Sequence, residues 1–278
     1  MAMTGALLSL VVAGQAKASP LFMLNSVQAS LPAKHTRHHE MYGKHASGDG
    51  AWVLKGIDEA QKRAPRKDDW WVGVKAVPLE SPVGFELSLW GRVLFSPQRP
   101  TSFCSGATYA ALMLGLQKQY PEDPGLTPDA HESLRQTEAD GSRRHDQIGF
   151  WGVWNGSGAG LYWALTDLTG AGVSVPASQL RPGDFVQIYW SSTRGHSAVF
   201  LGWHQSRDGS RFMRIWSSQE GTSGMGDWNV PITRISRLVG ARLTEGIRIL
   251  AAPVGVFPYS GPIGDKVPAS GWPVRTRK

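Results

Sequence analysis

The 278-residue sequence contains a single cysteine, Cys104, so no disulfide can form within the chain. It lacks an apolar run long enough to cross a bilayer, and we therefore expect no integral membrane segment. Lys and Arg outnumber Asp and Glu by 29 to 22, which gives a net charge of +7, yet no dense basic run marks a nucleic-acid site. These features favour an anionic partner other than nucleic acid, such as an acidic cell-wall polymer.

The N-terminus has the outline of a secretory signal peptide over residues 1–18. An apolar run covers residues 6–13, and Ala16-Lys17-Ala18 precedes Ser19 as an Ala-x-Ala cleavage site. The first four residues carry no Lys or Arg, and a disordered leader is the alternative. We expect an exported monomer, located in the periplasm or outside the cell. An unpaired thiol is a liability in an oxidising compartment unless it is used, so export favours a catalytic Cys104 over a buried structural cysteine.

The flanking segments differ in composition from the centre of the chain. Residues 19–50 are polar and predict a linker; the histidines there, His35, His38, His39 and His45, have no carboxylate or cysteine at a metal-ligand spacing, so no metal and no cofactor is expected. Residues 51–64 have helical periodicity, and residues 70–95 favour short strands. Residues 253–278 predict a disordered basic tail rich in Pro and Gly, which leaves 51–252 as the domain.

Residues 101–118 predict a helix with Cys104 in its first turn. Ala, Leu and Met dominate the segment, and Thr101 or Ser102 can cap its start. Unpaired amides and the positive end of the helix dipole favour ionisation of a thiol at this position. Gly106 and the alanines behind it leave room for another part of the chain to approach closely.

Three strands, 185–190, 196–203 and 211–218, predict an antiparallel meander that is apolar, and so covered, on both faces. If His204 pairs with Arg211 across the turn, His196 lies opposite Gln219. His196 then shares one face with Gln219, and Ser218 points to the other. A helix that carries Cys104 must reach that first face for a thiol to meet the imidazole.

Cys104, His196 and Gln219 together supply a nucleophile, a base and an orienting group. An amide partner leaves a thiolate and imidazolium pair at rest. Ser217 is the alternative third residue, because a two-residue register shift keeps the same face, and His145 is the substitute base. A Gly- and Trp-rich segment predicts a substrate-binding rim; its residues are Trp151, Trp154 and Asn155.

Three short motifs resemble those of the NlpC-type and CHAP-type papain-like cysteine hydrolases of bacteria. They are Phe-Cys-Ser-Gly-Ala-Thr-Tyr at 103–109, Leu-Arg-Pro-Gly-Asp-Phe-Val at 180–186 and Gly-His-Ser-Ala-Val-Phe-Leu-Gly at 195–202. The resemblance implies an α+β fold with the nucleophile helix packed on an antiparallel sheet. It also implies cleavage of amide bonds in peptidoglycan stem peptides, with Cys104 as nucleophile and His196 as base.

Because of two departures from the family pattern, the sequence does not identify which bond is cut. Phe103 stands where the family has an acidic residue, and Gln219 or Ser217 stands at the third position. The alternatives are a papain-like acyltransferase or lipid amidase, suggested by the apolar residues 151–163, and a non-catalytic module that binds the cell wall.

Overall fold

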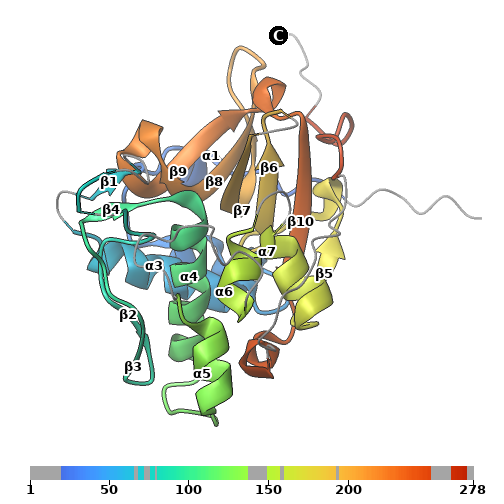
Figure 1. The fold of residues 1–278 in the computed structure, drawn as a ribbon. Coiled ribbons are helices and arrows are strands. Elements are labelled where there is room, and N and C mark those ends of the chain that lie inside the picture. Colours follow the sequence, from blue (N-terminus) through green and yellow to red (C-terminus); the bar gives the residue numbers. More distant parts are fainter. Residues whose placement is uncertain are drawn as a thin grey trace, which may run out of the picture.

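The computed structural model describes residues 20–65, 68–71, 76–78, 80–136, 149–156, 160–191, 194–251 and 264–273. It has an α+β fold in which helices cover a six-stranded antiparallel sheet (Figure 1). The predicted signal peptide lies outside the described residues. No helix in the described ranges combines the length and the hydrophobicity needed to cross a membrane.

The main sheet has the strand order β5-β10-β6-β7-β8-β9. The strands, each antiparallel to its neighbours, are β5 (Gly172–Val175), β10 (Arg237–Leu243), β6 (Phe185–Tyr189), β7 (Gly195–Gln205), β8 (Arg211–Gln219) and β9 (Gly224–Pro231). The predicted meander forms the centre of this sheet. Two small sheets, β1 (Asp69–Trp70) with β4 (Thr101–Ser102) and β2 (Leu87–Leu89) with β3 (Arg92–Phe95), lie beside α4 in Figure 1.

Helices supply the rest of the regular structure. The α-helices are α1 (Ser26–Ala29), α2 (His38–Tyr42), α3 (Gly50–Arg63), α4 (Cys104–Gln119), α5 (Pro128–Leu134), α6 (Gly149–Trp154) and α7 (Gly160–Trp163), and a π-helical turn, η2 (Ala164–Leu168), follows α7. Short 3₁₀ helices are η1 (Gly43–His45), η3 (Ala177–Gln179), η4 (Glu220–Thr222), η5 (Ile232–Arg234) and η6 (Gly246–Ala251). The helices expected at 51–64 and 101–118 are therefore confirmed as α3 and α4. The predicted cap of α4 is wrong, because Thr101 and Ser102 form β4 and Phe103 takes the N-cap position without a side-chain hydrogen bond.

Both faces of the main sheet are buried, as the sequence predicts. Side chains alternate along β7, so Val199 and Leu201 join the cluster that contains α3 and α4, whereas Ala198 and Phe200 join a second cluster on the other face. The second face is covered by chain from both ends of the sequence, including Leu21 and Trp272. Each strand of the meander is consequently apolar on both sides.

Two of the predicted segments are folded parts of the domain. Residues 20–50 are not a linker: Tyr42 and His38 are fully buried, and Met23 bridges Trp203 of β7. Residues 264–273 are not a disordered tail, because Asp265 pairs with Leu238 at the start of β10 and residue 272 is buried against the sheet. Both segments cover apolar sheet surface, which local composition does not reveal.

Helices α3 and α4 pack at close range because glycine stands at their contact. A Cβ atom placed on Gly56 would lie 1.9 Å from the carbonyl oxygen of Ala111, and one placed on Gly115 would lie 2.5 Å from the carbonyl oxygen of Trp52. Backbone on both sides of the contact leaves no flexible group that can move away. The two helices therefore need glycine at these positions to pack as closely as they do.

We expect Gly56→Ala to destabilise the protein by about 2–5 kcal/mol, since the two helices must separate to accept the methyl group. Gly221→Ala is the matched control: its Cβ would meet only Trp228 Nε1 at 3.7 Å. Urea unfolding followed by tryptophan fluorescence measures both variants. Equal stability of the two would show that the contact between α3 and α4 is not as tight as described.

Candidate active site

Cys104 is the first residue of α4 and is only partly buried. Every residue behind it, from Ser105 to Leu116, is buried. Close packing holds this turn in place, since a Cβ on Gly106 would lie 2.0 Å from the carbonyl oxygen of Pro82. The first turn of α4 carries no acidic residue, so the helix dipole acts on the thiol without an opposing charge from that turn. The thiol thus stands at the accessible end of an otherwise buried helix.

A buried carboxylate anchors the chain just before Cys104. Ser102 donates a hydrogen bond to Asp68 over 3.1 Å and lies 2.9 Å from the hydroxyl of Ser218 on β8. Asp68 also accepts from the amide of Met225 on β9, and burial raises the pKa of its carboxyl group. Sequence analysis missed Asp68, because its partners are distant in the chain. These bonds fix the start of α4 to the β8–β9 edge of the sheet.

The β7–β8 register brings His196 and Gln219 together, though by a different route from the one expected. His204 pairs with Phe212, one position away from the predicted Arg211, and a bulge between Phe200 and Gly202 then shifts the register by one. Beyond the bulge Val199 pairs with Trp216, and the same register continued along the strands sets His196 opposite Gln219. The one-position difference in the pairing of His204 and the one-position shift at the bulge cancel, so His196 and Gln219 are neighbours as predicted.

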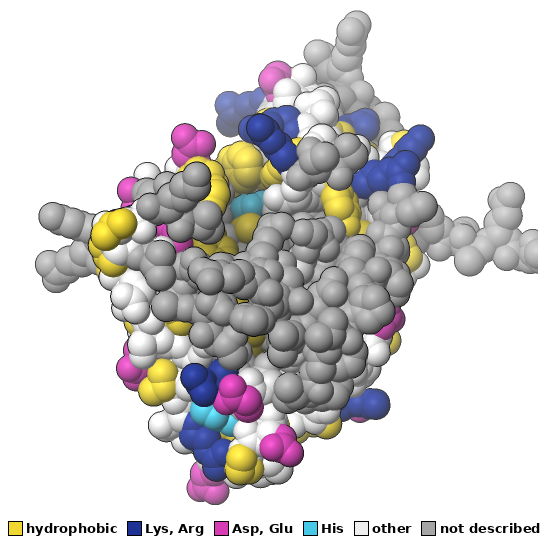
Figure 2. Space-filling model, viewed as in Figure 1, with side chains coloured by type: hydrophobic (Ala, Val, Ile, Leu, Met, Phe, Trp, Pro, Cys, Tyr) yellow, Lys and Arg dark blue, Asp and Glu magenta, His cyan; other side chains and the backbone are white. Residues whose placement is uncertain are grey.

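His196 lies at the start of β7 among aromatic rings. The ring centroids of Trp190 and Trp228 lie 6.0 and 6.2 Å from the imidazole centroid, and the guanidinium of Arg234 lies within cation–π distance of both indoles. Figure 2 shows a histidine in a hollow on one side of the molecule, with hydrophobic side chains around it and Lys or Arg side chains above. Neither ring contact of His196 was predicted from sequence, because Trp190 and Trp228 come from different parts of the chain.

Burial lowers the pKa of His196 to about 4, and nearby Gln219 offsets this in part. No hydrogen bond of ordinary geometry joins the two side chains: within the described residues, His196 Nε2 and Gln219 Oε1 are both buried without a partner. Gln219 instead donates to Thr222 and to the carbonyl of Gly226. At neutral pH the imidazole is therefore neutral, which suits a base and contradicts the expected resting imidazolium.

We expect His196→Phe to make the free energy of unfolding less dependent on pH under acidic conditions. A histidine whose pKa falls from 6.5 to about 4 on folding must lose its proton to fold between these values, so stability decreases as pH falls from 6.5 to 4. This difference in pKa corresponds to about 3 kcal/mol of unfolding free energy. Urea unfolding at several pH values between 4 and 7.5 measures the slope, with exposed His39→Gln as the control that keeps it. An unchanged slope in His196→Phe would contradict the burial of a neutral imidazole.

The body of α4 does not pack on the face that carries His196, and this expectation was wrong. The helix shares its cluster with Val199, Leu201 and Trp216, whereas His196 alternates with Ala198 on the opposite face. Ser218, predicted to point away from His196, does so and faces Ser102. No hydrogen bond between Cys104 and His196 is present among the described residues. Their meeting at the end of the sheet is therefore part of the proposal below.

The predicted substrate-binding rim is a packing element. Trp154 is fully buried and donates from its indole to the carbonyl of Ser105, and Asn155 accepts from the Ser105 hydroxyl. Trp151 is 6% exposed and packs against Tyr109. These side chains are buried and support the first turns of α4.

Two further expectations near the site have different outcomes. The alternative third residue, Ser217, donates to the carbonyl of Ser197 on β7 and is fully buried. His145, the substitute base, lies outside the described residues.

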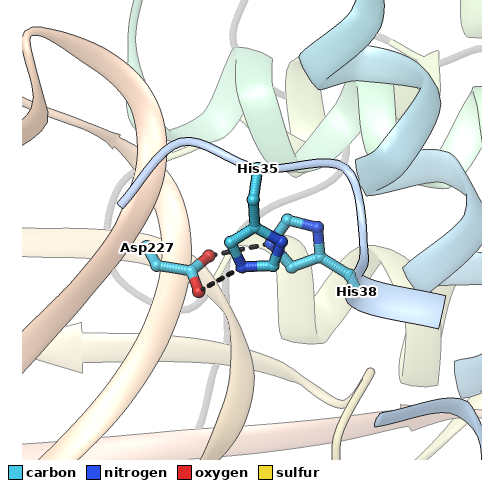
Figure 3. A group of neighbouring side chains, drawn as sticks. All are labelled: His35, His38 and Asp227. Carbon is cyan, nitrogen blue, oxygen red and sulfur yellow. Dashed lines mark hydrogen bonds and ion pairs between the residues drawn. The ribbon is translucent and has the colours of Figure 1, made fainter. Parts of the chain in front are cut away.

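A second polar cluster joins the N-terminal segment to the sheet. Figure 3 shows His35 and His38 stacked beside Asp227, with ring centroids 4.0 Å apart. Nε2 of His38 lies 2.8 Å from one carboxylate oxygen of Asp227, and Nε2 of His35 lies 3.1 Å from the other. The ligand-type atoms of the three residues lie within 4.8 Å of one another, so a metal site has to be considered.

Hydrogen bonding favours a network of charges over a metal centre at this cluster. His38 contacts a carboxylate through each ring nitrogen, Asp58 at 2.8 Å and Asp227 at 2.8 Å, which makes it an imidazolium. Nδ1 of His35 accepts from the amide of Arg37, so its Nε2 carries a proton toward Asp227. Arg214 binds that same carboxylate oxygen at 2.9 Å. Two carboxylates thus meet two cations, and a metal ion would have to displace protons beside a guanidinium.

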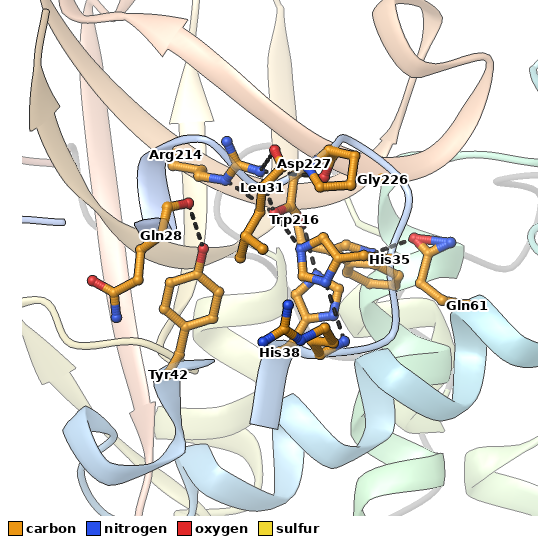
Figure 4. A network of polar contacts seen from close by, with 12 residues as sticks. Gln28, Leu31, His35, His38, Tyr42, Gln61, Arg214, Trp216, Gly226 and Asp227 are labelled. Carbon is orange, nitrogen blue, oxygen red and sulfur yellow. Dashed lines mark hydrogen bonds and ion pairs between the residues drawn. The ribbon is translucent and has the colours of Figure 1, made fainter. Parts of the chain in front are cut away.

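The network reaches from the sheet to three segments before residue 62. Figure 4 shows Arg214 and Asp227 on β8 and β9 facing the chain around Leu31, with Trp216 turned toward Gln61 of α3. The coulombic attraction of the carboxylates outweighs burial and raises the pKa of His38, while the cations lower the pKa of Asp227 despite its burial. The segment 20–50 is therefore fixed to the domain by buried charge as well as by apolar contact.

We expect Asp227→Asn to destabilise the protein by about 3–5 kcal/mol, because His38 and Arg214 would lose their shared counter-ion in a buried site. Exposed Glu122→Gln is the control with little effect. Denaturant unfolding compares the two variants at pH 6. Near-equal stability would mean that the network adds nothing to the fold.

The contribution of His38 should also depend on pH. Its raised pKa means that the stabilisation is complete below 6.5 and lost as pH rises through the folded-state value, whereas the lowered pKa values of Asp58 and Asp227 require pH above about 4. The difference in unfolding free energy between the wild type and His38→Gln should therefore be largest between pH 4 and 6.5 and shrink in alkaline buffer. A difference that grows with pH would contradict an imidazolium.

Comparisons of the chain with protein-family models, with curated proteins and with solved structures gave no match. The site geometry, and not a relative, therefore has to support any assignment of function.

Proposed function

We propose that the protein is an exported cysteine hydrolase that cleaves peptide or amide bonds of bacterial peptidoglycan, with a papain-like arrangement of NlpC type or CHAP type. The observation that carries the proposal is the position of Cys104: the only cysteine of the chain is the accessible first residue of a helix whose next twelve residues are buried. A thiol at that place is favoured as a thiolate.

The order of elements also supports the proposal. A nucleophile helix is followed along the chain by β6, β7 and β8, with a histidine at the start of β7 and an amide side chain across from it on β8. Nε2 of His196 is turned to the buried side near Gln219, so Nδ1 is the nitrogen left for the thiol proton. Catalytic hydrogen bonds are often long before substrate binds, and the proposal requires Cys104 Sγ to approach His196 when it does.

The proposed reaction has two steps. The Cys104 thiol gives its proton to His196 and its sulfur attacks the scissile carbonyl, after which the imidazolium returns the proton to the departing amine. Water, deprotonated by His196, then cleaves the thioester and releases the acid and the free thiol. Amides at the start of α4 would stabilise the oxyanion. The pKa of about 4 keeps His196 unprotonated and ready to act at neutral pH.

The structure bears differently on the two alternative functions. A lipid or acyl-group substrate was suggested by the apolar residues 151–163, and the burial of Trp151 and Trp154 removes that support. A non-catalytic module that binds the cell wall differs from the proposal in the reactivity of its thiol. Since the chain has one cysteine, alkylation by iodoacetamide reports on Cys104 alone.

We expect Cys104→Ala to reduce the release of new amines from purified peptidoglycan at least about a thousandfold with folding intact, because the side chain is at an accessible helix end. His196→Ala should reduce it strongly as well. His204→Ala is its matched control on the same strand, with a buried and unpartnered Nε2 among the described residues. The wild-type thiol should be alkylated at pH 7 faster than a free cysteine. Retained turnover in Cys104→Ala, or slow alkylation in the wild type, would remove the hydrolase proposal.

A further inference from the structure

Beside His196 lie Trp190, Trp228 and Arg234, three side chains that the proposed reaction steps do not use. Trp190 and Trp228 are half-buried, their ring centroids are 5.9 Å apart, and their planes are nearly perpendicular at 66°. The guanidinium carbon of Arg234 lies 5.8 Å from the centroid of the first ring and 5.5 Å from that of the second. We call Trp190, Trp228, Arg234 and His196 the Trp/Arg cluster.

The charge of this cluster is not compensated locally. Arg234 is exposed, and among the described residues no carboxylate pairs with it. Two further exposed arginines border it: the carbonyl of Arg194 accepts from the amide of Trp190, and Arg237 pairs with Tyr189 at the end of β6. One guanidinium, that of Arg234, therefore lies over both indole rings, and two more exposed arginines occur where the backbone meets Trp190 and the end of β6. Elsewhere Arg214 and Arg242 bind buried carboxylates, so arginine without a partner is not the rule in this protein.

A buried polar atom adds a second, independent observation. His196 is only 7% exposed, and its Nε2 has no hydrogen-bond partner within the described residues. An unsatisfied buried donor or acceptor has a free-energy cost of about 1–3 kcal/mol unless a partner arrives. The cluster therefore combines a guanidinium without a carboxylate partner among the described residues and half-buried indole surface beside a buried imidazole.

This combination matches one kind of ligand chemistry. A guanidinium that stacks on an indole keeps its N–H edge free for two parallel hydrogen bonds to a carboxylate. Half-buried indoles offer flat surfaces to sugar rings and peptide planes. We infer that the Trp/Arg cluster is a subsite that binds a free carboxylate of a glycopeptide substrate next to the scissile bond. The inference rests on the proposed hydrolase function, since it names the part of the substrate that this site recognises.

Binding can be measured separately from turnover. The experiment uses the full chain with Cys104→Ala, titrated by calorimetry with a soluble disaccharide tetrapeptide of peptidoglycan and with the same fragment after amidation of its carboxyl groups. We expect Arg234→Gln to weaken binding of the free-carboxylate fragment by about tenfold or more, the effect of losing a charge-assisted hydrogen bond. Binding of the amidated fragment should be weak in both proteins and independent of Arg234.

Arg211→Gln is the matched control, because its guanidinium also stacks on an indole, 5.1 Å from the centroid of Trp272, at the other end of β7 and β8. It should leave the affinity unchanged, and Arg234→Lys, which keeps the charge without the fork, should bind with intermediate affinity. Equal losses in Arg234→Gln and Arg211→Gln, or equal binding of the two fragments, would overturn the subsite. Inorganic phosphate that binds as tightly as the fragment would overturn its assignment to a glycopeptide.

The outcomes separate the subsite from the hydrolase. Binding that depends on Arg234 in a protein whose thiol is inert supports the carboxylate subsite while removing the catalytic proposal. Turnover that depends on Cys104, with the same rate for free and amidated fragments and for Arg234→Gln, overturns the subsite and leaves the hydrolase standing.

Discussion

Both faces of the six-stranded sheet carry buried hydrophobic side chains, and covering them determines how the rest of the chain is used. Helices α3 and α4 cover the face of Val199 and Leu201. The other face has no long helix among the described residues; short pieces from both ends of the chain cover it, with Leu21 and Trp272 in the same cluster. Hydrophobic burial of this kind is the dominant favourable contribution to folding, so the terminal segments belong to the domain as much as its central strands do.

The covering segments explain the buried charges. Residues 20–50 are largely polar, and the chain around Ala33 lies along the edge strand β9. The backbone amide of Asp227 on β9 donates to the carbonyl of Ala33, and its carboxylate accepts a hydrogen bond from His38. The network thus adds buried hydrogen bonds and ion pairs to the apolar contacts of Leu31 and Tyr42 in the same segment. Because two carboxylates are paired with two cations, the free-energy cost of burying these charges is reduced.

The meander and the nucleophile helix could be predicted from sequence because their signals are local. Period-two alternation over three adjacent strands defined β6, β7 and β8, and the run of Ala, Leu and Met defined α4. The neighbours His196 and Gln219 were also predicted, although the assumed pairing of His204 was off by one and a bulge corrected it. A bulge has no reliable sequence signal, so this agreement depended on two errors that cancelled.

What could not be predicted are contacts between residues far apart in the chain. His38 and Asp227 are separated by 189 positions, and Ser102 and Ser218 by 116. The polar composition of 19–50 predicts a solvated linker, whereas the side chains of His35 and His38 contact the buried carboxylate of Asp227. The Trp- and Gly-rich segment around Trp154 predicts a substrate-binding rim, although its tryptophans are buried. Tryptophan is common both in packed cores and in binding sites, and composition alone does not distinguish a packing role from a binding role.

Burial of His196 constrains how any thiol chemistry at this site would proceed. A buried imidazole resists protonation, so a resting thiolate and imidazolium pair is disfavoured even though the start of α4 stabilises a thiolate. The proton would then move only when a substrate has brought sulfur and imidazole together. An anionic substrate group bound beside Arg234, over the two indoles that flank His196, would favour an imidazolium nearby. Recognition of a carboxylate and activation of the thiol would in that case be one event, because the bound anion raises the proton affinity of the base.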